Sequence, residues 1–333
     1  MLGNLAVLGA GSWGTALAIA LSSRFENVSL WCHDPGRAET MQASRENNRY
    51  LPGFLLPSNV HVSADLTRSS RGADILLSAI PSVHLRKIIS EALPALSRKT
   101  KIVSATKGME EGTLLRMSQI LSLVARDTVE SAIAVLSGPT FAKEVAAGEP
   151  AAVVVACEDG TICEQIQQAF STSKLRLYAS NDVIGTEIGA ALKNVIALGS
   201  GICSGLGLGS NSVAALVTRG LAEITRLAVA MGGQPRTLSG LAGLGDLVLT
   251  ATGDLSRNRF VGRRLGQGHS LESILGEMTM VAEGVTTCKA AYQLGLNHGV
   301  DMPITNEMHE VLYRSKDPRQ AIRDLMRRPL TNE

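Results

Sequence analysis

A glycine-rich turn near the N-terminus constrains the fold more than any other feature of the sequence. The segment Gly9-Ala10-Gly11-Ser12-Trp13-Gly14 directly follows a short apolar run and opens an alanine-rich helical stretch over residues 15–21. In a strand–turn–helix unit, the first glycine of G-x-G-x-x-G permits a tight turn, the second leaves room for a pyrophosphate, and the third lets the helix pack on the strand. The phosphates then lie at the positive end of the helix. We therefore predict a dinucleotide-binding unit in which Gly9, Gly11 and Gly14 approach the cofactor.

The first half of the chain alternates β-type runs with helical stretches. The seven β-type runs cover residues 5–8, 28–32, 75–80, 102–105, 133–136, 152–156 and 175–178. Several are apolar at consecutive positions, as expected for parallel strands buried on both faces. After about residue 179 the sequence indicates helices separated by glycine-rich joints. We predict an α/β chain with an N-terminal Rossmann-type, doubly wound, mainly parallel sheet (residues 1–182, dinucleotide binding), followed by an all-helical C-terminal domain (residues 183–333, substrate binding).

The composition narrows the classes of protein and of partner. Charged residues make up only 19% of the 333 residues, and 32 Lys and Arg nearly balance 30 Asp and Glu, so no chain-wide field attracts nucleic acid or an anionic membrane. The five cysteines are scattered and never spaced C-x-x-C, which favours a reducing cytoplasm over a disulfide framework or a thiolate metal site. Lys193 interrupts the longest apolar stretch, residues 188–208, so membrane insertion is not expected.

The end of the second β-type run is where the adenosine ribose is read in this type of fold. Asp34 lies twenty positions after Gly14, between His33 and Pro35, with Arg37 close by. Asp34 suits a ribose 2′-hydroxyl but is also a common turn former before proline, whereas His33 and Arg37 suit a 2′-phosphate. The residues therefore leave NAD and NADP equally open.

Ligands in open α/β sheets gather at the carboxyl ends of the strands. Small or polar residues follow three of the predicted strands, including Thr106-Lys107-Gly108 and the segment from Ser137 to Thr140. A lysine between threonine and glycine at a strand end is poorly explained as a solvated surface residue. We therefore expect a functional role for Lys107.

Lys193 occupies an apolar helical stretch over residues 186–200. Its own helical face carries small residues, and we expect them to leave room for a ligand beside the ammonium. The four small residues on this face are Thr186, Gly189, Ala197 and Ser200. A lysine that extends to solvent is the alternative, and the small-residue face favours a site.

Two further segments carry polar groups suited to an anionic substrate. Asp246 follows the glycine-rich segment 240–245, and Ser256-Arg257-Asn258 follows a turn. Ser256 can cap a helix whose first turn presents backbone N–H groups, and Arg257 offers bidentate donors for phosphate. Each segment alone is equally consistent with an ordinary cap or a basic helix start. The six histidines show no metal-binding spacing, so no metal is expected.

Taken together, the motifs resemble the bacterial branch of the soluble NAD(P)-dependent sn-glycerol-3-phosphate dehydrogenases over nearly the whole chain. The matching segments are GAGSWGTALA at Gly9, ATKGME at Ala105, SGPTFAKE at Ser137, ALKNVIA at Ala191, GLAGLGDLVLT at Gly240, SRNR at Ser256 and VAEG at Val281. One departure is Ala251, where many members have cysteine. The resemblance implies reversible reduction of dihydroxyacetone phosphate to sn-glycerol 3-phosphate, used for glycerophospholipid synthesis, by a cytoplasmic enzyme.

The resemblance also assigns residues. Those implied to contact NAD or NADP are Ser12, Trp13, His33, Lys107, Ala142, Arg257, Val281 and Glu283. Those implied to surround the substrate are Lys107, Gly138, Thr140, Lys193, Asp246, Ser256, Arg257 and Asn258. Reduction of a ketone leaves an alkoxide that needs a proton, and we expect Lys193 to supply it, oriented by Asp246.

Two alternatives share parts of this pattern. A hydroxy-acid dehydrogenase with a Rossmann and a helical domain would keep the glycine turn and the lysine but recognise a carboxylate. A non-catalytic dinucleotide sensor would keep the turn without needing Lys193, Asp246 and Arg257 together. Cofactor preference, feedback regulation and the physiological direction stay open, as does the oligomeric state, for which a homodimer is one option.

Overall fold

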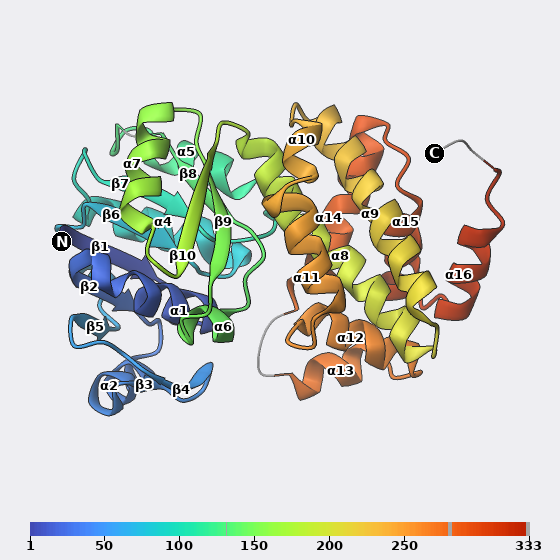
Figure 1. The fold of residues 1–333 in the computed structure, drawn as a ribbon, viewed down its shortest axis with the longest axis horizontal. Helices are drawn as coiled ribbons and strands as arrows, with labels where there is room; N and C mark the ends of the chain where they lie inside the picture. The colour runs from blue at the N-terminus through green and yellow to red at the C-terminus, as the bar shows by residue number, and fades with distance from the viewer. Residues whose placement is uncertain (131, 279–281, 331–333) are drawn as a thin grey trace. The chain divides into compact units, whose positions relative to one another are not determined.

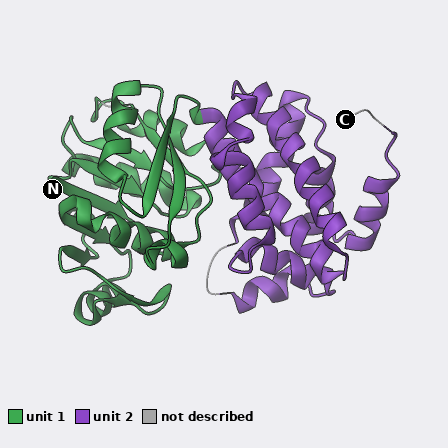
Figure 2. Cartoon of the chain, viewed as in Figure 1, with its two compact units in different colours: residues 1–110, 115–183 green, residues 111–114, 184–333 purple. Residues whose placement is uncertain are grey.

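The chain forms two compact units, residues 1–110 with 115–183 and residues 111–114 with 184–333 (Figure 2). The computed structural model describes residues 1–130, 132–278 and 282–330. Each unit has its own set of secondary-structure elements (Figure 1).

Unit 1 is built on an eight-stranded sheet in the order β10-β9-β8-β7-β6-β1-β2-β5. Its strands are β1 (Leu2–Leu8), β2 (Phe25–Trp31), β5 (Val60–Ser63), β6 (Ile75–Ser78), β7 (Lys101–Ser104), β8 (Ala134–Ser137), β9 (Ala151–Ala156) and β10 (Leu175–Ser180). Of the strand pairs in this sheet, β8 with β9 is antiparallel and the others are parallel. The predicted doubly wound, mainly parallel sheet is therefore confirmed.

Unit 1 also contains seven α-helices among its described residues, and the strands of its sheet contribute residues to two separate hydrophobic cores. The helices are α1 (Ser12–Leu21), α2 (Pro35–Ser44), α3 (Leu66–Ser70), α4 (Leu85–Ala92), α5 (Met117–Ala125), α6 (Ala142–Ala146) and α7 (Gly160–Phe170). In β6, Ile75 and Leu77 belong to one core, which includes Phe170 of α7, and Leu76 belongs to another, which includes Ile89 of α4. Burial on both faces explains why the strands are apolar at consecutive positions.

Three short strands of unit 1 were missing from the sequence prediction. Strand β5 lies at the edge of the sheet beside β2, and exposed His61 separates buried Val60 from Val62, so its apolar signal is only two residues long. Strands β3 (Glu46–Asn47) and β4 (Leu51–Leu55) form a separate antiparallel hairpin after α2. Strand β3 has only two residues, and Pro52 and Gly53 interrupt β4, so neither strand gives an alternating pattern to detect.

Unit 2 is helical throughout the residues that the structure describes. Its helices are α8 (Val183–Gly205), α9 (Ser210–Ala230), α10 (Pro235–Leu238), α11 (Asp246–Thr252), α12 (Arg257–Gly266), α13 (Leu271–Glu277), α14 (Glu283–His298), α15 (Pro303–Tyr313) and α16 (Pro318–Met326). A π-helical turn, Leu241–Gly245, leads directly into α11. The predicted all-helical second half is confirmed.

Helix α8 is the central helix of unit 2. Among the described helices, it alone is long and apolar enough to cross a membrane, yet 89% of its most apolar window is buried within the fold. Glycines bring α12 against it: a Cβ at Gly262 would lie 1.9 Å from the carbonyl oxygen of Leu198, and one at Gly201 would lie 2.1 Å from that of Arg259. Its apolar surface is therefore occupied by neighbouring helices.

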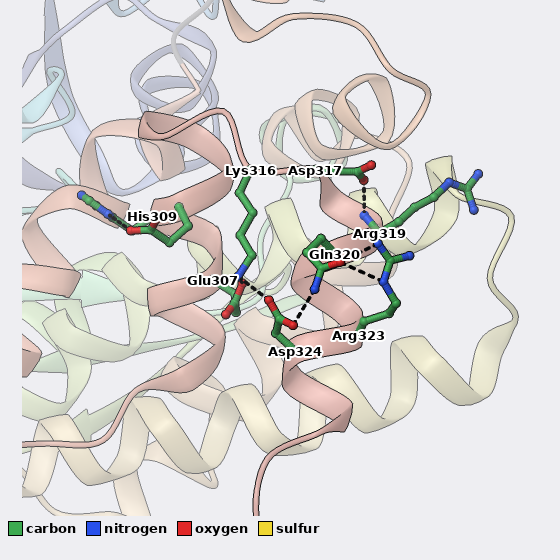
Figure 3. A network of polar contacts seen from close by, with 9 residues as sticks. Glu307, His309, Lys316, Asp317, Arg319, Gln320, Arg323 and Asp324 are labelled. Carbon is green, nitrogen blue, oxygen red and sulfur yellow. Dashed lines mark hydrogen bonds and ion pairs between the residues drawn. The ribbon is translucent and has the colours of Figure 1, made fainter.

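Polar contacts join α16 to α15 in unit 2. Lys316 Nζ lies 2.5 Å from Glu307 Oε2 on α15 and 2.8 Å from Asp324 Oδ2 on α16, as Figure 3 shows. At the start of α16, the Asp317 carboxylate accepts a hydrogen bond from the backbone N–H of Arg319. These contacts hold the last described helix onto α15.

A buried carboxylate on α9 caps the start of α15. Glu223 is 2% exposed and accepts hydrogen bonds from the backbone N–H groups of Ile304 and Thr305. Burial raises the pKa of Glu223 to about 7, while these hydrogen bonds act in the opposite direction.

Candidate active site

The glycine turn between β1 and α1 has the shape that a pyrophosphate needs. Gly9 has φ +114°, and a Cβ there would lie 2.7 Å from the carbonyl oxygen of Ala79. A Cβ at Gly14 would lie 1.9 Å from the carbonyl oxygen of Gly9, whereas one at Gly11 would meet nothing within 4 Å. Gly9 and Gly14 are thus required by close packing, and Gly11 leaves open space at the N-terminus of a ten-residue helix. The turn fits a dinucleotide pyrophosphate.

Trp13, in the first turn of α1, adds a second observation that fits a ligand. Its indole Nε1 is buried and has no hydrogen-bond partner among the described residues. The ring packs in an apolar cluster with Leu51 of the β3–β4 hairpin and with Ala142, the first residue of α6. The structure therefore brings together Trp13 and Ala142, two residues to which the resemblance assigns cofactor contacts.

The end of β2 lies next to the glycine turn, because the Gly9 N–H donates to the Trp31 carbonyl at 3.1 Å. Asp34 is the N-cap of α2 and accepts the Arg37 N–H at 2.8 Å. This hydrogen bond is the main reason why the pKa of Asp34 lies below its usual value, with further contributions from the nearby cations. His33 is exposed, and its Nδ1 lies 3.1 Å from Arg37 Nη2. Asp34 was considered as a turn former or a ribose ligand, and in the structure it caps α2.

The predicted substrate residues of unit 1 follow the ends of neighbouring parallel strands. Lys107 lies three residues beyond the end of β7, is partly exposed and has a polar partner in the fold. Gly138 directly follows β8 with φ +148°, and a Cβ there would lie 2.8 Å from the Cα of Val153. Thr140 Oγ1 donates to the Gly138 carbonyl at 3.2 Å. These residues share the strand-end edge of the sheet with the glycine turn.

Lys193 lies in the middle of α8, and only 6% of its side chain is exposed. Its Nζ forms an ion pair with Asp246 Oδ1 and donates to Thr250 Oγ1 at 2.9 Å. The Asp246 side chain is fully buried. The alternative of a lysine extending to solvent is therefore wrong, since the ammonium is held inside unit 2 between a carboxylate and a hydroxyl.

The small-residue face of α8 is present, and two of its residues approach the backbone of neighbouring segments. A Cβ at Gly189 would lie 2.8 Å from the carbonyl oxygen of Ala242, so this part of α8 contacts the π-helical turn before α11. Ser200 Oγ donates to the Ala251 carbonyl at 2.6 Å. These two small residues let α8 approach the backbone on either side of Asp246, and the expected room for a ligand beside the ammonium stays a prediction.

Thr250 was missed by the sequence analysis. It stands four residues after Asp246 on α11, which places both side chains on one helical face. Thr250 Oγ1 also donates to the Asp246 carbonyl at 2.6 Å. The i, i+4 spacing from a buried acid was the signal that could have identified it.

The start of α12 carries the three residues predicted to bind phosphate. Ser256 is the N-cap of this helix, as predicted, and its Oγ accepts the Arg259 N–H at 3.2 Å. Arg257 is exposed, and no hydrogen bond or ion pair joins its guanidinium to any residue that the structure describes. The helix N-terminus and a guanidinium thus stand together, as an anion site requires.

Asn258 has partners in the fold. Its Nδ2 donates to Asn194 Oδ1 at 2.9 Å, and its Oδ1 accepts the Gly284 N–H at 3.0 Å. The amide therefore joins the residue after Lys193 to the first turn of α14. Asn194 was not predicted, although its place directly after the lysine was a signal. Of the remaining predicted residues, Glu283 begins α14 and has a partner in the fold, and Val281 lies outside the described residues.

The chain is similar to known proteins at the levels of family, sequence and structure. Residues 4–163 match the family model of the NAD-dependent glycerol-3-phosphate dehydrogenase N-terminus, and residues 182–323 match that of its C-terminus. The chain is 51% identical to a protein from Koribacter versatilis over 100% of this chain and 99% of the relative. It is 50% identical to one from Syntrophotalea carbinolica over 99% of each chain. Both relatives are named glycerol-3-phosphate dehydrogenase [NAD(P)+].

A solved structure agrees with these matches. The crystal structure of glycerol-3-phosphate dehydrogenase from Coxiella burnetii superposes with a TM-score of 0.93 at 38% sequence identity. The superposition covers 98% of this chain and 99% of that one.

Proposed function

The chain belongs to the NAD(P)-dependent glycerol-3-phosphate dehydrogenase family, and from this premise we propose that Lys193 is the proton donor and acceptor of the reaction. The family reaction is reversible hydride transfer between NAD(P)H and dihydroxyacetone phosphate, giving sn-glycerol 3-phosphate for glycerophospholipid synthesis. The observation that carries the proposal for Lys193 is its buried contact with Asp246 and Thr250.

Lys193 gives a proton to the substrate oxygen. NAD(P)H, when bound, would supply a hydride to C2 of the ketone, and the oxygen at C2 would then need the proton that Lys193 holds. An ammonium in a water-poor environment can both stabilise the developing negative charge and transfer the proton. In the reverse direction, the neutral amine accepts the proton of the C2 hydroxyl.

Asp246 and Thr250 orient the lysine. A lysine side chain has four rotatable bonds, and two fixed partners reduce the number of positions its Nζ can take. Asp246 is fixed in turn at the start of α11, where the glycine-rich π-helical turn packs directly on α8. A proton donor must lie within hydrogen-bond reach of its acceptor, so this fixed position serves catalysis.

The N-terminus of α12 is the proposed site for the substrate phosphate. Ser256, Arg257 and Asn258 offer a hydroxyl, a guanidinium and backbone N–H groups to an anion. Asn258 has a second, structural role. Its amide hydrogen-bonds to Asn194, the residue after Lys193 on α8, and to Gly284 on α14. Lys107, Gly138 and Thr140 are the residues that we propose for the substrate in unit 1.

The dinucleotide is proposed to bind to the strand-end edge of the sheet in unit 1. The open space at Gly11 and the indole N–H of Trp13, which has no partner among the described residues, support this placement. The full set of proposed cofactor residues is Gly9, Gly11, Ser12, Trp13, Gly14, His33, Lys107, Ala142, Arg257, Val281 and Glu283. Accordingly, we propose unit 1 as the dinucleotide-binding domain and unit 2 as the substrate-binding domain.

We also propose that the enzyme works in the cytoplasm. All five cysteines are buried and unpaired, as expected in a reducing compartment.

Initial rates of NADH and NADPH oxidation with dihydroxyacetone phosphate test the function. Glycerol 3-phosphate should form, and turnover should require both the phosphate and the ketone of the substrate. Turnover of a hydroxy or keto acid in its place would favour a hydroxy-acid dehydrogenase, and dinucleotide binding without turnover would favour a sensor. The first result would contradict the phosphate site at α12, and the second would contradict the catalytic role of Lys193.

A further inference from the structure

The β3–β4 hairpin of unit 1 is fixed to the glycine turn, although the sequence analysis assigned it no role. Asn47 of β3 is fully buried, and its Nδ2 donates to the Ala10 carbonyl at 3.1 Å and to Thr15 Oγ1 at 2.8 Å. Its Oδ1 accepts the N–H of Tyr50 at 3.2 Å. A buried amide with three partners is costly to displace, so the connection between β3 and β4, residues 48–50, has a defined position beside the turn.

Tyr50 in this connection joins the hairpin to the end of β2. Its hydroxyl accepts a hydrogen bond from Arg37 Nη1 at 3.2 Å, and the Arg37 guanidinium carbon lies 4.9 Å from the centre of the Tyr50 ring. Arg37 also donates to Cys32 Sγ at 3.1 Å and lies 3.1 Å from His33 Nδ1. Each of its three nitrogens therefore has a partner, and Arg37 is held in one place.

Arg49 brings a second guanidinium to the same ring. Its guanidinium carbon lies 5.4 Å from the centre of the Tyr50 ring, within the range of a cation–π contact. The side chain is exposed, and no hydrogen bond joins it to any residue in the described part of the chain. Its donors are therefore available to a ligand, in contrast to those of Arg37.

The charges near this ring are mainly positive. Arg37, Arg49 and His33 are the basic groups, and the charges of all three act on Asp34, the carboxylate that caps α2. In dinucleotide-binding folds, the ribose of the adenosine half lies at the end of β2, which is the segment that carries His33 and Asp34. A group on the 2′ position of that ribose would thus meet two guanidinia.

We propose that Arg49, supported by Arg37 and the Tyr50 ring, binds the 2′-phosphate of NADP(H) and sets a preference for NADP(H) over NAD(H). A phosphate monoester offers several anionic oxygens to the planar fork of a guanidinium, whereas the 2′-hydroxyl of NAD(H) offers no charge. This inference rests on the proposed dinucleotide site and names the residue that chooses between the two cofactors. It goes beyond His33 and Arg37, which the sequence had suggested.

The test compares kcat/KM for NADPH and for NADH in the wild type and in Arg49→Gln. The loss of a charge-assisted contact should lower kcat/KM for NADPH about 10- to 100-fold and change the value for NADH less than about threefold. Arg68→Gln is the matched control, because Arg68 is an exposed arginine on α3 of the same unit. It removes the same charge and should change both values less than about twofold.

Binding of two nucleotides to the protein without substrate separates this inference from the proposed function. Adenosine 2′,5′-bisphosphate should bind to the wild type at least about tenfold more tightly than adenosine 5′-monophosphate, and Arg49→Gln should abolish most of the difference. Equal losses with NADPH and NADH would overturn the inference, because Arg49 would then act through the fold or a shared part of the cofactor. Unchanged NADPH kinetics would also overturn it. Failure of both nucleotides to bind would instead contradict the dinucleotide site itself.

Discussion

Replacing Lys193 by methionine should damage catalysis and stability through two separate effects. Methionine has a similar length but no charge and no donor. The loss of a general acid should lower kcat by about 10²- to 10⁴-fold, which corresponds to about 3–5 kcal/mol of activation free energy. Affinity for the dinucleotide should change little, because the glycine turn that receives it belongs to the other unit.

The structure also gives the expected cost in stability. The Asp246 side chain is fully buried, and only 6% of the Lys193 side chain is exposed. Removal of the cation leaves the buried Asp246 carboxylate without the Lys193 charge, which costs about 3–5 kcal/mol. In a unit of this size, such a loss lowers the Tm by about 6–20 °C. A fall in kcat alone would therefore not distinguish catalysis from misfolding.

The double variant Lys193→Met/Asp246→Asn separates the two effects. An amide needs no counter-ion, so the double variant should recover much of the lost Tm. It still lacks the proton donor, and its kcat should stay as low as that of Lys193→Met. The measurements are kcat with saturating NADPH and dihydroxyacetone phosphate, thermal unfolding and equilibrium binding of NADPH.

Two outcomes would refute the reasoning. A folded Lys193→Met variant that keeps kcat within about tenfold of the wild type would exclude Lys193 as the general acid. Recovery of kcat in the double variant would show that the single substitution acted through stability.

Three further predictions concern unit 2. Burial raises the pKa of Glu223 to about 7 from its ordinary value near 4.5, so the folded state holds this proton more tightly than the unfolded state. Stability should therefore fall as the pH rises from about 4.5 to 7. The variant Glu223→Gln should show a Tm that changes less with pH across that window. Asn258→Ala leaves the buried Asn194 amide and Gly284 N–H without their partner, so chemical denaturation should show a loss of about 2–4 kcal/mol. Arg257→Ala should lower kcat/KM for dihydroxyacetone phosphate by about 30- to 150-fold and for phosphate-free dihydroxyacetone far less; equal losses would show that Arg257 does not bind the phosphate.

Local sequence patterns predicted the architecture of both units. The glycine turn, the consecutively apolar strands and the switch to helices after β10 each depend on residues close together in the chain. Strand β5 escaped because edge strands are short and only half buried, as the exposed His61 between two valines shows. The antiparallel pairing of β8 with β9 depends on how the chain returns to the sheet, which neither strand encodes alone.

Contacts between residues distant in sequence were harder to predict. Asn47 lies in a polar stretch that reads as a loop, yet its side chain is buried against the glycine turn more than thirty residues earlier in the chain. Asn194 and Asn258 are likewise sixty-four positions apart. An asparagine in a loop and one buried in a network have the same local sequence pattern, because what distinguishes them is a partner brought close only by folding.

The small-residue face of α8 shows that one sequence pattern can serve more than one purpose. Small side chains on one helical face allow close approach, but the sequence does not say whether a ligand or a backbone approaches. In α8 it is the backbone before α11, since a Cβ at Gly189 would lie 2.8 Å from the Ala242 carbonyl. That close contact sets the distance between the helices that carry Lys193 and Asp246, so a larger residue at position 189 would separate the two charges. The glycine therefore positions the proposed catalytic lysine through packing, and Gly189→Ala should weaken both stability and kcat without touching the substrate.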